Sequence, residues 1–331
     1  MTLAVEVSGL VKEYGGRGGV RALDGVDLQI PAGTVMCVLG PNGAGKTTTV
    51  RIISTLLKPT SGSVRVAGVD VLKDPMAARH RIGLSGQYAA VDENLTGFEN
   101  LRMVARLYGM TKPQASARAR ELISSFQLEH AAERRSSTYS GGMRRRLDLA
   151  GALVARPKVV VLDEPTTGLD PRGRQDMWQV ISELVEDGTS VLLTTQYLEE
   201  ADFLADRITL IDKGRVIAQG SAEDLKSTIG GETMTIKIAP GQDMRTAHRV
   251  IAELGVGEPT TSPHTTEVSV IVADGTKTMV EVLRRLDDAH VYVVDANVHK
   301  PSLDDVFLSL TGQPAGTAEP IEADRVEEAV L

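Results

Sequence analysis

The sequence contains one cysteine, no long apolar run and no surplus of basic residues. With Cys37 as its only thiol, the chain forms no internal disulfide, which suits a reducing cytosol. No apolar run approaches the ~18–20 residues that a membrane-spanning helix requires. The first residues also lack a basic stretch followed by an apolar one. We therefore expect neither a transmembrane helix nor a signal peptide.

Acidic residues outnumber basic residues by 44 to 36, which gives a net charge of −8. A protein that binds a polyanion usually carries a basic surface. We therefore expect no nucleic acid partner. Residues 312–331 are acidic and poor in apolar side chains, a composition that predicts a disordered tail.

Short apolar runs alternate with helical patterns over residues 1–230. Val35–Leu39, Val159–Leu162 and Val191–Leu193 are apolar at every position, as expected of strands buried on both faces of a parallel sheet. Between the last two, Asp170-Pro171 predicts a helix start with Asp170 as its N-cap. Strand, helix and strand in this order predict an α/β fold.

A helical insertion is expected at about residues 95–155, where Thr96 and Glu99 fit a capping box. A short helix at Ser221–Lys226 closes this large domain, and Gly230-Gly231 marks a junction. Residues 231–311 predict a small α/β domain. Its expected strands are Glu232–Ile238, Glu267–Val272 and Val291–Val298, and its expected helices are Ala247–Leu254 and Thr278–Leu286.

A glycine-rich loop directly follows the first apolar strand and opens a helix. Its residues match the phosphate-binding pattern GxxxxGK[ST]: Gly40, Pro41, Asn42, Gly43, Ala44, Gly45, Lys46 and Thr47. Glycines let backbone N–H groups converge on phosphate oxygens at a helix N-terminus. Lys46 is expected to reach the β- and γ-phosphates, Thr47 to bind Mg²⁺, and Thr48 to add a further phosphate contact.

Two acids follow the second apolar strand, at the edge where open α/β sheets bind ligands. Asp163 is expected to hold Mg²⁺, directly or through water. Glu164 is expected to act as general base on the attacking water. Together with the loop, these acids predict an ATP-hydrolysing or GTP-hydrolysing enzyme.

The segment Tyr139-Ser140-Gly141-Gly142-Met143 narrows this class, because it resembles the LSGGQ signature of ABC ATPases. Leu162–Asp170, LDEPTTGLD, is similar to the family's Walker B and D-loop run. Gln87 fits the Q-loop glutamine, and Tyr14 fits the aromatic that stacks on adenine. The resemblance covers about residues 3–226. It implies a P-loop NTPase of the ABC nucleotide-binding type, with a mixed sheet and a helical insertion.

The resemblance also implies roles for these residues. Ser140, Gly141 and Gly142 would contact the γ-phosphate held by a second subunit, so that two chains form a homodimer around ATP. Asp170 would lie at that interface. Gln87 would contact Mg²⁺ and transmit closure to a membrane permease.

Plainer interpretations stay open for several of these residues. Tyr14 is also compatible with an ordinary strand-end aromatic, and Gln87 with a surface loop. Arg144, Arg145 and Arg146 follow the signature, where cations oppose the helix dipole. They either form a solvated face or help to hold nucleotide, and we favour the solvated face for at least two of them.

Two positions depart from the common family pattern. Met143 replaces the signature glutamine, and Gln196 stands where the family places a switch histidine near the γ-phosphate. Glutamine donates and accepts hydrogen bonds but carries no charge. The segments YSGGMRRRLD, TTQYLEEAD and PSLDDVFLSLTG, which ends at Gly312, resemble the daunorubicin-resistance type of ATPase subunit.

This resemblance implies an ATPase bound peripherally to the cytoplasmic face of the membrane. It would power export of a hydrophobic drug-like or lipid substrate through a separate permease. Two alternatives remain: a soluble ABC ATPase acting on ribosomes or DNA, and a degenerate cassette that hydrolyses ATP poorly because of Gln196. Glu164 argues against the second alternative.

Overall fold

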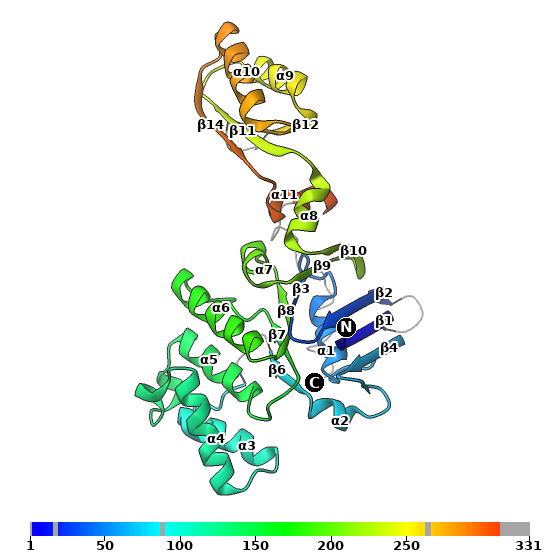
Figure 1. Ribbon diagram of the computed structural model, residues 1–331, viewed down its shortest axis with the longest axis vertical. Helices are drawn as coiled ribbons and strands as arrows, with labels where there is room; N and C mark the ends of the chain where they lie inside the picture. The colour runs from blue at the N-terminus through cyan, green and yellow to red at the C-terminus, as the bar shows by residue number, and fades with distance from the viewer. Residues whose placement is uncertain (1, 16–18, 87–89, 262–265, 312–331) are drawn as a thin grey trace. The chain divides into compact units, whose positions relative to one another are not determined.

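The computed structural model describes residues 2–15, 19–86, 90–261 and 266–311 (Figure 1). Two of the predicted features, the position of Gln87 and the acidic tail at 312–331, lie outside the described residues. The chain divides into two compact units, one extending to Ala222 and the other beginning at Glu223. The division therefore precedes the glycine pair at 230–231.

A six-stranded sheet forms the centre of the first unit. Its strands are β3 (Val35–Leu39), β6 (Ile82–Ser85), β7 (Val159–Asp163), β8 (Ser190–Thr195), β9 (Arg207–Asp212) and β10 (Arg215–Gly220). They lie in the order β10-β9-β3-β8-β7-β6, parallel throughout except for β10, which runs antiparallel to β9. Every residue of β3, β7 and β8 is buried, as their continuous apolar sequences predicted.

A second, antiparallel sheet belongs to the same unit. It contains β1 (Leu3–Tyr14), β2 (Val20–Pro31), β4 (Ser61–Val66) and β5 (Val69–Asp70) in the order β2-β1-β4-β5. Helix α1 (Lys46–Ile53) contacts both sheets, and its buried Val50, Ile52 and Ile53 join one apolar core with residues from each. The core therefore fixes the N-terminus of α1 at the edge of the parallel sheet.

The helices of the insertion lie on the side of the parallel sheet away from the antiparallel sheet (Figure 1). The insertion contains α3 (Gly97–Leu107), α4 (Lys112–Ser125) and α5 (Gly141–Ala152), joined by 3₁₀ turns at Glu129–Ala131 and Ser136–Thr138. The predicted capping box of Thr96 and Glu99 is confirmed at the start of α3. The unit also contains α2 (Pro75–Arg79), α6 (Pro171–Glu186) and α7 (Leu198–Leu204).

The second unit is a small α/β domain. Its sheet has the order β12-β13-β11-β14, with β11 (Glu232–Ile238), β12 (Val256–Thr261), β13 (Glu267–Val272) and β14 (Val293–His299). Its helices are α8 (Ala222–Ile229), α9 (Met244–Leu254), α10 (Gly275–Asp288) and α11 (Leu303–Thr311). The expected strands and helices are present, α8 is longer than predicted, and β12 and α11 were missed.

Candidate functional site

The glycine-rich loop connects β3 to α1, as the phosphate-binding pattern requires. A Cβ atom on Gly40 would lie 2.2 Å from the carbonyl oxygen of Ile211, so only glycine fits there. Gly45 has φ +109°, and a Cβ atom on it would lie 2.7 Å from the carbonyl oxygen of Ala22. No side chain caps the first turn of α1, which leaves its N–H groups available to an anion.

Lys46 is the first residue of α1 and is only 5% exposed. Its Nζ donates hydrogen bonds to the carbonyl oxygens of Gly40 at 2.8 Å and Pro41 at 3.1 Å. Burial lowers the pKa of Lys46, while the charges of Glu164 and Asp163 raise it. Lys46 therefore interacts electrostatically with Asp163 at the end of β7 and with Glu164 just after it, as expected if the three residues share one ligand site.

The acids lie at the carboxyl end of β7, beside β8. Asp163 is buried, and the Thr194 hydroxyl donates to its Oδ1. Glu164 has a φ of +49°, in the left-handed region that non-glycine residues rarely adopt. Its N–H donates to the Thr194 carbonyl oxygen at 3.0 Å, and the Thr167 hydroxyl donates to its Oε2 at 3.2 Å. An uncommon backbone conformation of this kind often accompanies a functional residue.

Gln196 directly follows β8, which pairs with β3 on one side and β7 on the other. Parallel strands end at the same edge, so half-buried Gln196 lies between the phosphate-binding loop and the acids. Its neighbour Tyr197 is the N-cap of α7, and the Tyr197 N–H donates to Thr195 Oγ1 at 3.0 Å. The topology thus places Gln196 next to the ends of the strands that carry the phosphate-binding loop and Asp163.

The antiparallel sheet brings Tyr14 to the same end of the unit. Tyr14 pairs with Val20, two residues before Ala22, whose carbonyl oxygen packs against Gly45. The Lys12 ammonium lies 5.0 Å from the centre of the Tyr14 ring. The position of Tyr14 is therefore compatible with stacking on adenine. The ring would then contact both the adenine base and the Lys12 ammonium.

The signature segment lies at the N-terminus of α5. Ser140 is the N-cap and accepts a hydrogen bond from the Met143 N–H at 3.2 Å. Asp170 caps α6 in the same way, accepting from the Gly173 N–H at 2.8 Å. Among the described residues, no hydrogen bond joins Ser140–Gly142 to the phosphate-binding loop of its own chain.

Two charged residues of α5 were missed as parts of this site. Arg145 is buried rather than solvated, and Asp148 lies one turn further along the helix, also buried. Burial lowers the pKa of Arg145 and raises that of Asp148. The signal in the sequence was a pair of opposite charges three residues apart beside the buried Leu147 and Leu149.

The donor set suits Mg²⁺ held together with a phosphate. The described residues contain no group of three or more His, Cys, Asp or Glu side chains that could hold a metal alone. Asp163 and the Thr47 hydroxyl instead offer one carboxylate and one hydroxyl beside the phosphate-binding loop. Mg²⁺ is commonly bound by one or two carboxylates plus substrate phosphates and water, so the residues fit this ion.

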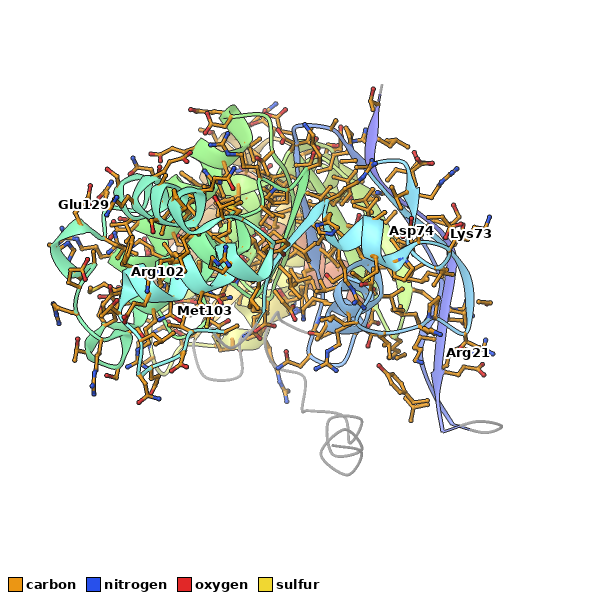
Figure 2. The ribbon with its side chains drawn as sticks, turned by 90° about the horizontal axis from the view of Figure 1, so that it is seen from below. Arg21, Lys73, Asp74, Arg102, Met103 and Glu129 are labelled. Carbon is orange, nitrogen blue, oxygen red and sulfur yellow. The ribbon has the colours of Figure 1, made fainter. Side chains whose placement is uncertain are left out.

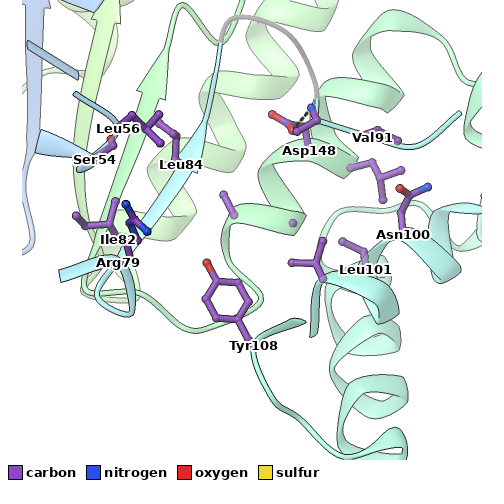
Figure 3. Close-up of a pocket in the computed structure, with 15 residues that line it drawn as sticks. Ser54, Leu56, Arg79, Ile82, Leu84, Val91, Asn100, Leu101, Tyr108 and Asp148 are labelled. Atoms are coloured by element: carbon purple, nitrogen blue, oxygen red, sulfur yellow. Dashed lines mark hydrogen bonds between the residues drawn. The ribbon is translucent and has the colours of Figure 1, made fainter. Parts of the chain in front are cut away.

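A separate cavity of about 320 Å³ lies beside the insertion (Figure 3). Figure 3 shows Tyr108, Leu101 and Asn100 of the α3 region facing Arg79 and Ile82 across this space. Asp148 of α5 lines it as well. The cavity lies beside α3 and β6 and does not include the phosphate-binding loop.

Comparison with known proteins gives matches over nearly the whole chain. The family model for ABC transporters matches residues 23–167, and the model for the C-terminal domain of DrrA1-3-like ATP-binding proteins matches residues 220–311. The chain is 50% identical to the daunorubicin/doxorubicin resistance ATP-binding protein DrrA of Streptomyces peucetius, over 98% of each protein. It is 46% identical to the doxorubicin resistance ATP-binding protein DrrA of Mycobacterium tuberculosis H37Rv, over 94% of this chain and 95% of that protein.

A solved structure gives a consistent match. The first unit resembles the dimeric, post-hydrolysis state of the ATP-binding cassette MJ0796 bound to ADP and Pi, with a TM-score of 0.60 and 28% identity. The match covers 66% of this chain and 98% of that one.

Proposed function

Because the chain belongs to the ABC transporter ATP-binding proteins of the daunorubicin/doxorubicin-resistance type, we propose that its ATPase activity powers export of a hydrophobic drug-like or lipid substrate. The relatives are resistance proteins for daunorubicin and doxorubicin, which supports the substrate class. No helix among the described residues is long and apolar enough to cross a bilayer. We place the membrane pathway in a separate permease chain. The comparisons give no support to a role on ribosomes or DNA.

In this proposal the edge of the parallel sheet binds ATP and Mg²⁺. The loop amides and Lys46 hold the phosphates, while Thr47 and Asp163 hold the ion. Glu164 orients and deprotonates the attacking water, and Gln196 contacts the γ-phosphate through its neutral amide. A bound Mg²⁺ would neutralise charge on the phosphate oxygens as the terminal bond breaks.

The observation that carries the two-chain site concerns the signature glycines. A Cβ atom on Gly142 would meet no atom within 4 Å, and one on Gly141 only Leu169 Cδ2 at 3.9 Å. Neither residue has a positive φ. Glycine in a helix costs roughly 0.5–1 kcal/mol relative to alanine, and among the described residues no other element would exclude a Cβ atom at either position. The open space at the N-terminus of α5 would admit a phosphate bound to a second copy of the chain.

The cavity beside α3 supports docking of a permease. Two apolar side chains of the neighbouring helix α3 are exposed, Met103 at 39% and Leu107 at 80% (Figure 2). An amphipathic helix of a membrane subunit would bury these side chains and fill the cavity. Together with the need for a membrane pathway, this surface favours peripheral attachment at the cytoplasmic face of the membrane.

The experiment is reconstitution with the membrane protein that co-purifies from solubilised membranes. We expect ATP-dependent accumulation of a fluorescent, hydrophobic drug in liposomes that contain both chains. Accumulation should be abolished when Glu164→Gln replaces the wild-type ATPase. Recovery of the chain with ribosomes or nucleic acid, and with no membrane protein, would contradict the proposal.

A further inference from the structure

The guanidinium of Arg145 is enclosed among main-chain carbonyl groups. Its Nε donates to the Pro165 carbonyl oxygen at 2.8 Å, and its Nη2 donates to those of Asp163 at 3.0 Å and Glu164 at 3.1 Å. Its Nη1 donates to the carbonyl oxygen of Gly86. One side chain from α5 thus binds three consecutive peptide groups at the end of β7.

Asp148 completes this arrangement from the same helix. Its Oδ2 lies 3.8 Å from Arg145 Nη1 and accepts a hydrogen bond from the Ser85 hydroxyl. Its Oδ1 accepts from the Ala90 N–H at 2.8 Å. A buried charge is costly unless it is paired and hydrogen-bonded, and here both members of the pair are satisfied. The fold therefore holds a fixed cation one turn into the signature helix.

The backbone of Glu164 is contacted by both Arg145 and Thr194. Its φ of +49° needs support from its surroundings, because a relaxed glutamate avoids that region. Thr194 binds its N–H, and Arg145 binds its carbonyl group. The planar guanidinium offers donors in fixed directions, which suits several carbonyl groups at once better than an ammonium does.

We propose that Arg145 is a positioning residue for ATP hydrolysis, which links the signature helix α5 to the backbone of Glu164. This inference rests on the proposed role of Glu164. Contact of the signature segment with nucleotide on a second chain would be transmitted through Arg145 to the peptide groups that orient the carboxylate. Hydrolysis would then proceed only when the signature helix is in place.

The test uses the full-length protein with Arg145→Gln and a matched control, Arg118→Gln. Arg118 also donates to main-chain carbonyl groups, those of Leu153 and Val154 just beyond the other end of α5. We expect Arg145→Gln to lower kcat about 10- to 100-fold, as expected when a reacting group is misplaced by about 1 Å. Binding of a fluorescent ATP analogue should stay within about threefold of wild type, since Arg145 does not touch the phosphate-binding loop. Arg118→Gln should change neither value.

Three further variants keep the test decisive. If Arg145→Gln alone does not fold, the double variant Arg145→Gln/Asp148→Asn removes both buried charges together, and it should show the same loss of kcat. Arg145→Lys should recover only part of the rate, because its ammonium lacks the planar fork. Placed in a Glu164→Gln background, Arg145→Gln should cause no further loss, because the two residues act as one unit.

A wild-type kcat in Arg145→Gln or in the double variant would overturn the inference. Full additivity with Glu164→Gln would do the same. The proposed function has a separate criterion, the loss of hydrolysis in Glu164→Gln alone. If that variant is slow while the Arg145 variants are normal, only the positioning role fails.

Discussion

The two compact units of the chain bury different kinds of side chain. The first buries charged residues near the ends of its parallel strands: Lys46, Arg145, Asp148, Asp163 and Glu200. The second has an apolar core that includes Ile236, Val282 and Leu286, and Thr233 is the only buried polar residue among its described residues.

Buried charge is therefore concentrated in the unit that carries the phosphate-binding loop. Burying a charge costs free energy unless a partner or a ligand offsets the cost. Buried charges are expected where a charged ligand binds. In the first unit, Lys46 and Asp163 are buried at or beside the phosphate-binding loop. The core of the second unit is apolar apart from Thr233 among its described residues.

The largest expected effect tests the acid at the end of β7. Glu164→Gln should slow ATP hydrolysis by ~10²–10⁴-fold, the usual contribution of a general base. ATP binding should persist, and a long-lived dimer should accumulate with ATP and Mg²⁺. Single-turnover hydrolysis and size-exclusion chromatography measure both effects. Turnover at the wild-type rate would remove Glu164 from the chemistry.

The second prediction concerns the buried cation of the loop. Lys46→Ala should weaken ATP binding, because each charge-assisted hydrogen bond to phosphate contributes ~1.5–3 kcal/mol. That range corresponds to roughly 10- to 150-fold in affinity for one bond, at ~1.4 kcal/mol per factor of ten. Equilibrium titration with a fluorescent nucleotide measures it. Unchanged affinity would mean that the loop does not hold phosphate.

A smaller effect is expected at Gln196. Gln196→Ala should lower the ATPase rate about 2- to 10-fold, the contribution of one neutral hydrogen bond. Gln196→His should retain activity and introduce an inflection near the ordinary histidine pKa of ~6.5, which the wild type should lack. Steady-state rates from pH 6 to 8 compare the three proteins. Equal rates for alanine and glutamine would show that Gln196 is a bystander.

The smallest effect on ATP chemistry is expected from removing the second unit. A protein that ends at Ala222 should fold and bind ATP within about twofold of the full chain, because the two units have separate cores. Association with the permease should weaken. Calorimetry, nucleotide titration and co-purification test these expectations. An insoluble product would show instead that the units share one core.

Local sequence patterns predicted the centre of the parallel sheet and several helix starts, because these depend on near neighbours. They did not predict the antiparallel sheet of the first unit or strands β6, β9 and β10. The continuous apolar runs identified β3, β7 and β8, and the Thr96 and Asp170 caps located the starts of α3 and α6. Strand β12 was missed because of its sequence, VGEPTT, which contains glycine and proline and little apolar surface. Helix α11 was missed because it was considered only as part of a family motif.

The candidate site was predictable where motifs have fixed spacing and not where contacts are long-range. The loop, the acids and Gln196 followed from their positions after strands. Arg145 did not, because its partners at Gly86 and Asp163–Pro165 are distant in sequence. A charged residue just after the signature is expected to be exposed to solvent. Only the three-dimensional structure shows that Arg145 is buried.

The most direct test of the central claim, that two chains build each ATP site, mixes two variants. Lys46→Ala disables the phosphate-binding loop, and Gly142→Asp places a carboxylate where the partner's γ-phosphate would lie. A Cβ atom on Gly142 would meet no atom of another described element within 4 Å, and an acid suits the N-terminus of α5. Each variant alone should be inactive. An equal mixture should recover about a quarter of the wild-type rate, since half of randomly paired symmetric dimers contain one intact site. Full activity of Gly142→Asp alone, or a mixture that stays inactive although mixed dimers form, would contradict the account.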